Sequence, residues 1–220
     1  MSRIRAVLFD LDGTLVDSAP DLAGAANGLR AQHGLPPLPY EQLRPMVGAG
    51  ARGMIGAAFG VAPGDDGFEP LRDAFLLRYE QGLLERTDVF AEMKPVLEAL
   101  ERDALAWGIV TNKAERYTMP LVEGLGLHRR AAVVIAGDTT PHSKPHPEPL
   151  LEAARRMQID PAQCVYVGDD HRDVQAGRAA GMATLVAAWG YLGRGEPIGA
   201  WGADAIIDSP GGLLNWLGLP

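Results

Sequence analysis

The stretch VLFDLDGTLVDS, residues 7–18, constrains the fold more than any other part of the chain. It begins with consecutive apolar residues, as expected for a short strand of a parallel sheet that is covered on both faces. Alternation along such a strand places Asp10 and Asp12 on the same side, and Gly13 allows a sharp turn at the strand end. Two carboxylates this close repel each other, so they require a cation or a shared proton. The alternative is a strand that ends in a solvated acidic turn.

Composition narrows the class of protein. With 220 residues, 47% of them hydrophobic, the chain can bury one main core and a smaller unit beside it. A net charge of −8 argues against a nucleic-acid-binding surface. The single cysteine, Cys164, excludes an internal disulfide and a cysteine-rich zinc site. Apolar stretches are shorter than a signal peptide or the roughly 18 residues of a membrane span, so we expect a cytoplasmic protein that binds no membrane.

After the first strand the pattern becomes helical. Residues 19–85 contain no convincing strand, and a glycine-rich turn lies at 47–53. Apolar residues at helical spacing predict helices over 22–29, 40–46, 53–59 and 68–83. This stretch therefore predicts a compact, all-helical unit.

From residue 93 onward, strands and helices alternate. Buried strands are expected at 106–111, 132–135, 165–167, 183–188 and 205–207. Helices are expected at 96–100, 119–122, 150–157, 174–180 and 213–217. Repeated strand–helix units imply a doubly wound, Rossmann-like parallel sheet, which makes this an α/β protein.

The helical unit is then an insertion after the first strand. We expect an α/β core of residues 1–17 and 88–220, with a helical cap of residues 18–87. The chain would cross between them near residues 17–18 and again between 85 and 92. Both crossings lie beside a strand end, an arrangement that suits a cap that opens and closes.

Polar residues gather where four of the expected strands end. In an open α/β sheet, ligands bind outside the carboxyl ends of the strands. The four clusters are DLD at 10–12, TNK at 111–113, HSKP at 142–145 and GDDHRD at 168–173. Because these strand ends share one edge of the sheet, the clusters together define a site.

Phosphoryl chemistry explains these residue types together. Asp10 and Asp169 could bind Mg²⁺, a hard cation that prefers oxygen ligands. Backbone N–H groups of residues 11–13, the Thr111 hydroxyl and the Lys144 ammonium could hold the phosphoryl oxygens. Of the two nearby carboxylates, one could attack phosphorus while the other handles the leaving-group proton.

Taken singly, each member has a simpler explanation. A lysine before proline is usually a solvated charge in a loop, and Thr111 could be a capping hydroxyl. Asp170 and Asp173 could be favourable acids at the start of the next helix. The five histidines show no spacing typical of metal ligands, and the pair His142 and His146 spans a proline, which argues against a helical zinc pair.

The four clusters resemble, in order, the four motifs of the haloacid dehalogenase superfamily, and they cover essentially the whole chain. The matching segments are FDLDGTL at 9–15, VTNK at 110–113, SKP at 143–145 and VGDD at 167–170, followed by Asp173. The helical insertion is similar to the small helical cap of that family. The resemblance implies a phosphatase of this type.

The resemblance also implies roles for individual residues. Asp10 would be the nucleophile that forms an aspartyl-phosphate. Asp12 would be the general acid and then the base for the hydrolytic water. Thr111, Asn112 and Lys144 would bind the phosphate.

The same resemblance implies a metal site. Mg²⁺ would be held by Asp10, the backbone carbonyl of Asp12, and Asp169. Asp170 and Asp173 would lie beside these ligands, and Asp170 stands where many relatives have serine.

Several branches of the superfamily can be compared with these residues. Dehalogenases need no metal and lack the aspartate that corresponds to Asp12, which argues against them. Phosphonate-cleaving relatives need a cap lysine, but residues 18–90 contain none. A phosphosugar mutase, which uses the same aspartyl-phosphate, stays an alternative, as does a catalytically silent module that binds a phosphorylated ligand.

Among the phosphatases, the chain resembles the phosphoglycolate phosphatase group. GARGM at 50–54, WGIVTNK at 107–113 and WGAD at 201–204 also resemble proteobacterial relatives, some of which hydrolyse N-acetylmuramic acid 6-phosphate in cell-wall recycling. Both substrates carry a carboxylate, which the guanidinium of Arg52 could bind unless Arg52 is only an exposed arginine at a helix start. We therefore expect a small phosphorylated metabolite as substrate and a monomer or homodimer.

Overall fold

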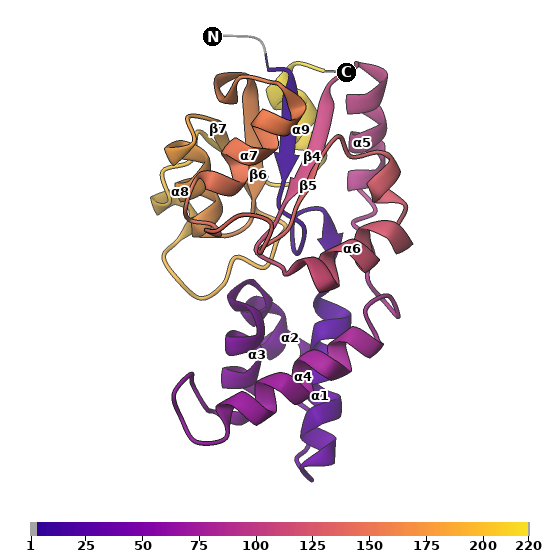
Figure 1. Cartoon of the computed structure of the whole chain (residues 1–220), viewed down its shortest axis with the longest axis vertical. Coiled ribbons are helices and arrows are strands. Elements are labelled where there is room, and N and C mark those ends of the chain that lie inside the picture. The colour runs from indigo at the N-terminus through magenta and orange to yellow at the C-terminus, as the bar shows by residue number, and fades with distance from the viewer. Residues whose placement is uncertain (1–3, 220) are drawn as a thin grey trace.

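A six-stranded parallel sheet lies at the centre of the larger lobe in the computed structural model, which describes residues 4–219 (Figure 1). The strand order is β5-β4-β1-β6-β7-β8. The strands are β1 (Ala6–Phe9), β4 (Ala106–Val110), β5 (Val134–Ile135), β6 (Cys164–Gly168), β7 (Ala183–Ala187) and β8 (Ala205–Ile207). Every neighbouring pair in this sheet is parallel. The predicted α/β fold with a doubly wound parallel sheet is confirmed.

Helices cover both faces of the sheet. The central strand β1 has apolar side chains on each face, and the helices bury them. The helices are α5 (Met93–Arg102), α6 (Glu115–Gly124), α7 (Glu148–Met157), α8 (His171–Ala179) and α9 (Gly211–Leu217). Val7 and Phe9 belong to one buried apolar cluster, together with residues of α5. Ala6 and Leu8 belong to a second cluster, together with residues of α7. Burial on both faces explains why this strand is apolar at consecutive positions.

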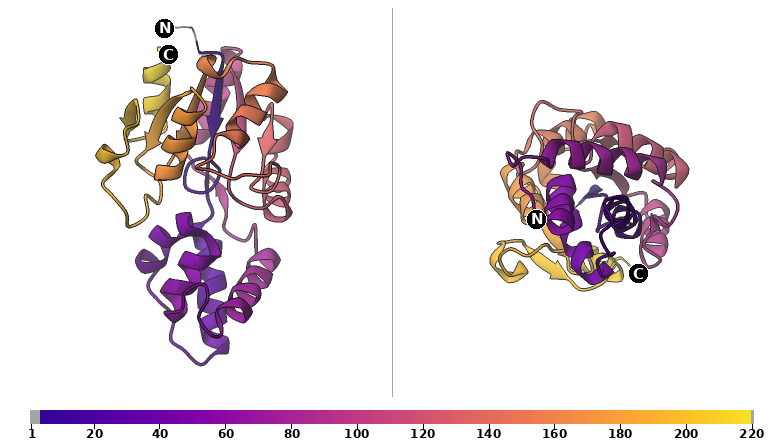
Figure 2. Two further views of the ribbon diagram at one scale, coloured as in Figure 1. Left: turned by 60° about the vertical axis from the view of Figure 1, so that its left-hand side comes forward. Right: turned by 90° about the horizontal axis from the view of Figure 1, so that it is seen from below.

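The other helices lie together at one end of the molecule, beyond the carboxyl end of β1, as Figures 1 and 2 show. They are α1 (Ala19–Gln32), α2 (Tyr40–Leu43), α3 (Gly50–Phe59) and α4 (Phe68–Gln81). The expected helix over 40–46 ends early, and a 3₁₀-helix, η1 (Arg44–Ala49), follows it. Pro45 lies at the start of η1, where it cannot supply the N–H that an α-helix needs.

A two-stranded antiparallel ladder joins the two lobes. β2 (Val16–Asp17) pairs with β3 (Asp88–Val89), so the outgoing and returning crossings lie side by side. Asp21 of α1 fixes the returning crossing, because its carboxylate accepts hydrogen bonds from Thr87 Oγ1 (2.7 Å) and the Thr87 N–H (2.9 Å). The proposed boundaries between core (1–17 and 88–220) and cap (18–87) fall at this ladder.

The remaining short elements are connectors. They are the 3₁₀-helices η2 (Leu127–Arg129), η3 (Pro161–Gln163) and η4 (Ile198–Ala200). β5 is shorter than the expected strand over 132–135, since only its last two residues pair with β4. Within residues 4–219, no helix has both the length and the apolar character needed to cross a membrane.

Candidate active site

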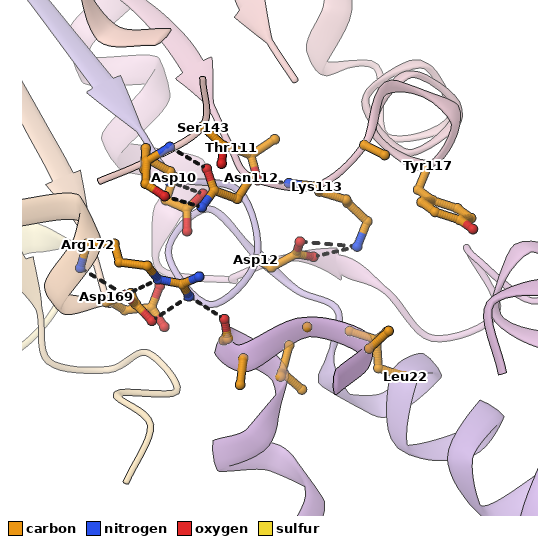
Figure 3. Close-up of a pocket in the computed structure, with 18 of the residues that line it drawn as sticks. Asp10, Asp12, Leu22, Thr111, Asn112, Lys113, Tyr117, Ser143, Asp169 and Arg172 are labelled. Atoms are coloured by element: carbon orange, nitrogen blue, oxygen red, sulfur yellow. Dashed lines mark hydrogen bonds and ion pairs between the residues drawn. The ribbon is translucent and has the colours of Figure 1, made fainter. Parts of the chain in front are cut away.

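A cavity of about 370 Å³ lies between the carboxyl edge of the sheet and the cap (Figure 3). Both lobes line it, so the site depends on how the cap sits against the core. The predicted site residues that line the cavity are Asp10, Asp12, Thr111, Asn112, Lys144, Asp169, Asp170 and Asp173. Arg52 is the one predicted site residue outside this lining. The structure therefore brings the four sequence clusters to one place.

A buried lysine links two of the aspartates. Lys144 Nζ lies 2.9 Å from Asp10 Oδ1 and donates a hydrogen bond to Asp173 Oδ1 at 2.7 Å. It also donates to the Tyr166 hydroxyl at 2.7 Å. Burial disfavours the charge on Lys144, but the two carboxylates outweigh this effect and hold its pKa above the usual value. Lys144 therefore stays a cation in the middle of the acidic cluster.

The carboxylates around Lys144 form a pocket of oxygen donors. Oxygens of Asp10, Asp169 and Asp173 all lie within 4.8 Å of one another. Burial raises the pKa of Asp10 to about 6, although Lys144 opposes this shift. Burial and the neighbouring Asp10 charge also raise the pKa of Asp169 well above its usual value. One lysine does not balance this much buried acidity, so the cluster could hold a metal cation.

Asp10 and Asp169 are both held in fixed positions. Asp10 Oδ1 is buried and faces Lys144 Nζ at 2.9 Å. Asp169 is held in place by hydrogen bonds from the Thr14 hydroxyl (2.9 Å) and the Tyr191 N–H (2.7 Å). A Cβ on Gly190 would overlap the Asp169 side chain, so only glycine leaves room for this arrangement.

Asp12 is positioned from two directions. The Ser18 hydroxyl donates to Asp12 Oδ1 at 2.5 Å, and Lys113 Nζ lies 3.1 Å from both carboxylate oxygens. Figure 3 shows the Lys113 side chain directed at this carboxylate. The same ammonium lies 4.6 Å from the centre of the Tyr79 ring, which belongs to the cap. Sequence reasoning gave Lys113 no role of its own, although it lies in the TNK motif.

Asn112 lines the cavity, but its side-chain amide forms hydrogen bonds with the backbone of Lys144. Its Nδ2 donates to the Lys144 carbonyl at 2.9 Å, and its Oδ1 accepts from the Lys144 N–H at 2.9 Å. The amide thus fixes the backbone that carries Lys144, and its phosphate contact stays a prediction. The Thr111 side chain is buried at the cavity, where its hydroxyl accepts a hydrogen bond from the Lys113 N–H at 3.2 Å.

Asp170 and Asp173 also cap the start of α8. Asp170 accepts a hydrogen bond from the Arg172 N–H, and Asp173 Oδ2 accepts one from the Asp170 N–H at 3.0 Å. Burial favours a higher pKa for Asp170, but its hydrogen bonds from Arg172 hold the pKa below the usual value. The capping interpretation from the sequence is therefore correct for both residues, and their relation to a metal stays a prediction.

Arg172, which sequence reasoning missed, links the core to the cap. Its Nε and Nη2 donate to the two Asp170 oxygens at 2.7 and 2.8 Å, and Nη2 also donates to the Gly48 carbonyl at 2.5 Å. Arg52 is exposed on α3. The guanidinium at the cavity is thus that of Arg172, whose place within the GDDHRD segment was the available signal.

The cap side of the cavity is mostly apolar. Its lining consists of Leu22, Val47, the backbone region 48–51, Phe75, Leu76 and Tyr79. Tyr117 of α6 lies beside Tyr79, with ring centres 5.9 Å apart. The hydroxyls of Tyr79 and Tyr117 are buried and have no hydrogen-bond partner within the described part of the chain. Burial raises the pKa of Tyr79 to about 12, so its phenol stays neutral.

Comparison with protein families shows to which family the chain belongs. A family model described as haloacid dehalogenase-like hydrolase matches residues 7–187. The chain belongs to this family. The matched segment includes all four polar clusters, so the resemblance predicted from the sequence is confirmed.

Individual relatives of this hydrolase family match over nearly their whole length. An N-acetylmuramic acid 6-phosphate phosphatase of Pseudomonas aeruginosa is 41% identical over 98% of this chain and 95% of that protein. A phosphoglycolate phosphatase of Xanthomonas campestris pv. campestris is 46% identical over 94% of this chain and 93% of that protein.

A solved structure of similar sequence has the same fold. The crystal structure of a predicted phosphoglycolate phosphatase from Haemophilus somnus superposes with a TM-score of 0.85 and 28% identity, covering 98% of this chain and 99% of that one. Family membership and fold are thus established for this chain, whereas the roles of its individual residues are a matter of proposal.

Proposed function

We propose that this protein hydrolyses phosphomonoesters in a Mg²⁺-dependent reaction that passes through an aspartyl-phosphate on Asp10. The observation that carries the proposal is the environment of Asp10 at the cavity. A buried ammonium lies 2.9 Å from Asp10 Oδ1, and oxygens of two further aspartates are within 4.8 Å. This environment suits a carboxylate nucleophile that meets a phosphate dianion.

The donor set fits Mg²⁺. The Asp10 carboxylate, the Asp12 backbone carbonyl and the Asp169 carboxylate would hold the ion, all through oxygen, which this hard cation prefers. When bound, Mg²⁺ reduces the repulsion between the attacking carboxylate and the phosphate. Asp173 accepts hydrogen bonds at both of its oxygens, one of them from Lys144, and would thus orient Lys144 at the site.

Asp10 and Asp12 have different tasks in the reaction. An Asp10 oxygen forms a bond to phosphorus as the bond from phosphorus to the ester oxygen breaks, and Asp12 gives its proton to the departing oxygen. Asp12, now ionised, then takes a proton from the water that attacks phosphorus, which releases inorganic phosphate and free Asp10. Ser18 and Lys113 orient Asp12 through both steps. Thr111 and Lys144 hold the phosphoryl oxygens.

The first candidate substrate is 2-phosphoglycolate, which would give glycolate and phosphate. The phosphoglycolate phosphatase of Xanthomonas campestris, 46% identical to this chain, supports it. A second candidate is N-acetylmuramic acid 6-phosphate, and the cavity favours it. At about 370 Å³, with an apolar cap side, the cavity falls within the range of roughly 300–1,000 Å³ that holds drug-sized ligands. A two-carbon acid fills only a small part of that space.

A panel of substrates tests both the proposed phosphatase activity and the identity of the substrate. The measurement is kcat/KM with Mg²⁺ for 2-phosphoglycolate, N-acetylmuramic acid 6-phosphate and p-nitrophenyl phosphate, repeated with a chelator. We expect hydrolysis that requires Mg²⁺ and a clear preference for one of the two carboxylate-bearing esters. Tight binding of a metabolite without hydrolysis of any ester would contradict the enzyme and favour a silent binding module. Isomerisation of a phosphosugar without phosphate release would favour a mutase.

A further inference from the structure

Outside the candidate active site, two histidines and a glutamate converge at the start of α7. His142 Nδ1 lies 2.6 Å from Glu148 Oε2, and His146 Nδ1 lies 3.9 Å from the same oxygen. The two imidazole rings stack with centres 4.3 Å apart. The side chains of all three residues are at least one-third exposed, so an ion in solution can reach them.

Sequence spacing did not suggest this convergence. Pro145 separates the histidines and excludes a helix that would carry both on one face. In the structure the segment is a loop, and α7 begins only at Glu148. The loop also contains Pro141 and Pro147, whose rings fix the backbone angle φ at each position. The expectation that His142 and His146 do not form a helical pair is therefore confirmed, and it is the loop that brings the two imidazoles together.

We propose that His142, His146 and Glu148 form a second metal site, which binds Zn²⁺ or a similar ion such as Co²⁺. Two imidazole nitrogens and one carboxylate oxygen are a ligand set that suits zinc and leaves one coordination position open. A tetrahedral ion with bonds of about 2.0–2.1 Å separates its donor atoms by about 3.3 Å. The 2.6 Å contact of His142 with Glu148 is a hydrogen bond, so the ion would displace its proton and widen this pair, while His146, now at 3.9 Å, moves closer.

The hydrogen bonding of His146 supports metal binding at Nδ1. This nitrogen accepts a long hydrogen bond, 3.2 Å, from the Glu148 N–H. The lone pair of this ring nitrogen therefore faces the Glu148 N–H, and a metal–nitrogen bond would replace this weak hydrogen bond.

The two metal sites differ in donor chemistry. The cluster around Asp10 consists of oxygen donors, whereas the loop site has two nitrogens. Mg²⁺ therefore prefers the first and Zn²⁺ the second. Lys144 lies between His142 and His146 in the chain, and Asn112 holds its backbone from the active-site side. An ion at the loop site thus fixes both ends of the segment that carries Lys144.

Titration of the whole protein with Co²⁺ in the presence of saturating Mg²⁺ tests this proposal. Mg²⁺ occupies the oxygen cluster, and the visible absorption of four-coordinate Co²⁺ reports the nitrogen site. We expect one equivalent to bind, and Zn²⁺ to displace it. His142→Ala combined with His146→Ala should abolish the absorption band, and Glu148→Gln should weaken binding about tenfold or more.

Two control proteins make the result decisive. His128→Ala removes an exposed histidine elsewhere and should leave the titration unchanged. Asp10→Asn combined with Asp169→Asn disables the oxygen cluster and should also preserve the Co²⁺ band. Loss of the band in that double variant, or its survival without His142 and His146, would overturn the proposal. Circular dichroism of each variant establishes that it is folded.

Discussion

The two sides of the cavity differ in chemical character. On the sheet side, the lining is charged and its members are fixed by one another, as Lys144 is by Asp10 and Asp173. On the cap side, the lining is mostly apolar, with two phenol hydroxyls at the boundary that have no partner within residues 4–219. We propose from this difference that the sheet side performs the phosphoryl chemistry and that the cap side selects the leaving group.

Several contacts connect the core and the cap, among them an ion pair between Arg116 and Glu80 and the ring contact of Tyr79 with Tyr117. Arg172 donates to the Gly48 carbonyl, and Arg44 of the cap donates to the Trp189 and Gly190 carbonyls at 3.1 and 3.0 Å. Lys113 lies against Tyr79. Most of these contacts are polar, and such contacts can break and re-form as a cap moves. Substitutions on each side should therefore have separable effects.

The largest effect is expected for Asp10→Asn on the sheet side. The amide cannot act as nucleophile, so kcat should fall by about 10⁴-fold or more, judged from losses of other catalytic nucleophiles. The free energy of unfolding should not fall, since burial already disfavours the Asp10 charge. Asp103→Asn, at an exposed position, is the control. Full activity of Asp10→Asn in the presence of Mg²⁺ would refute the mechanism.

Asp12→Asn should reduce kcat for alkyl phosphates by about 10²- to 10⁴-fold, the usual contribution of a general acid or base. With p-nitrophenyl phosphate, the leaving group needs no proton, so Asp10 should still be phosphorylated. Rapid-mixing absorbance should then show a burst of one equivalent of p-nitrophenolate, after which turnover is slow. A burst slowed as strongly as the hydrolysis of alkyl phosphates would argue against an acid role for Asp12.

Gly190→Ala should affect stability and metal affinity together. The added Cβ overlaps the Asp169 side chain, and overpacking of this kind costs about 1–3 kcal/mol of unfolding free energy. The Mg²⁺ concentration for half-maximal activity should rise as well. Gly195→Ala is the matched control, because a Cβ there has no neighbour within 4 Å. Equal behaviour of the two variants in chemical denaturation would show that Asp169 does not need this close packing.

Arg172→Ala should raise KM about tenfold with a smaller change in kcat. It removes a charged hydrogen bond between core and cap, and such bonds contribute roughly 1.5–3 kcal/mol. Arg52→Ala is the natural comparison, since this arginine is exposed and outside the cavity. Steady-state kinetics with the preferred substrate should leave Arg52→Ala within about twofold of wild type. A larger effect at Arg52 than at Arg172 would support the carboxylate-binding role predicted for Arg52 from the sequence.

Tyr117→Phe should have the smallest effect on the free protein. Its hydroxyl is buried without a partner among the described residues, so its removal should leave the free energy of unfolding within about 0.5 kcal/mol or raise it slightly. If the cap side selects the leaving group, KM for N-acetylmuramic acid 6-phosphate should rise by a few-fold while that for p-nitrophenyl phosphate stays constant. A uniform change for both substrates would remove Tyr117 from the selective surface.

Much of the fold and of the sheet side could be predicted from the sequence. Strands and helices have different apolar periodicities, and consecutive apolar residues identified the buried β1. Parallel strands bring their carboxyl ends to one edge, so residues far apart in sequence, such as Asp10 and Asp169, were expected to meet. The local sequence pattern and the sheet topology were sufficient to predict this side of the site, because each polar cluster comes after a strand.

The contacts on the cap side could be found only in the tertiary structure. Arg172 lines the cavity and Arg52 does not because of the way the cap packs against the core, which no sequence periodicity encodes. The hydrogen bonds of Asn112 with the Lys144 backbone likewise depend on packing and could not be read from the sequence. His142 and His146 meet through the path of a proline-rich loop. Sequence patterns thus determined the features that regular backbone geometry dictates, whereas contacts between separately folded segments required the assembled structure.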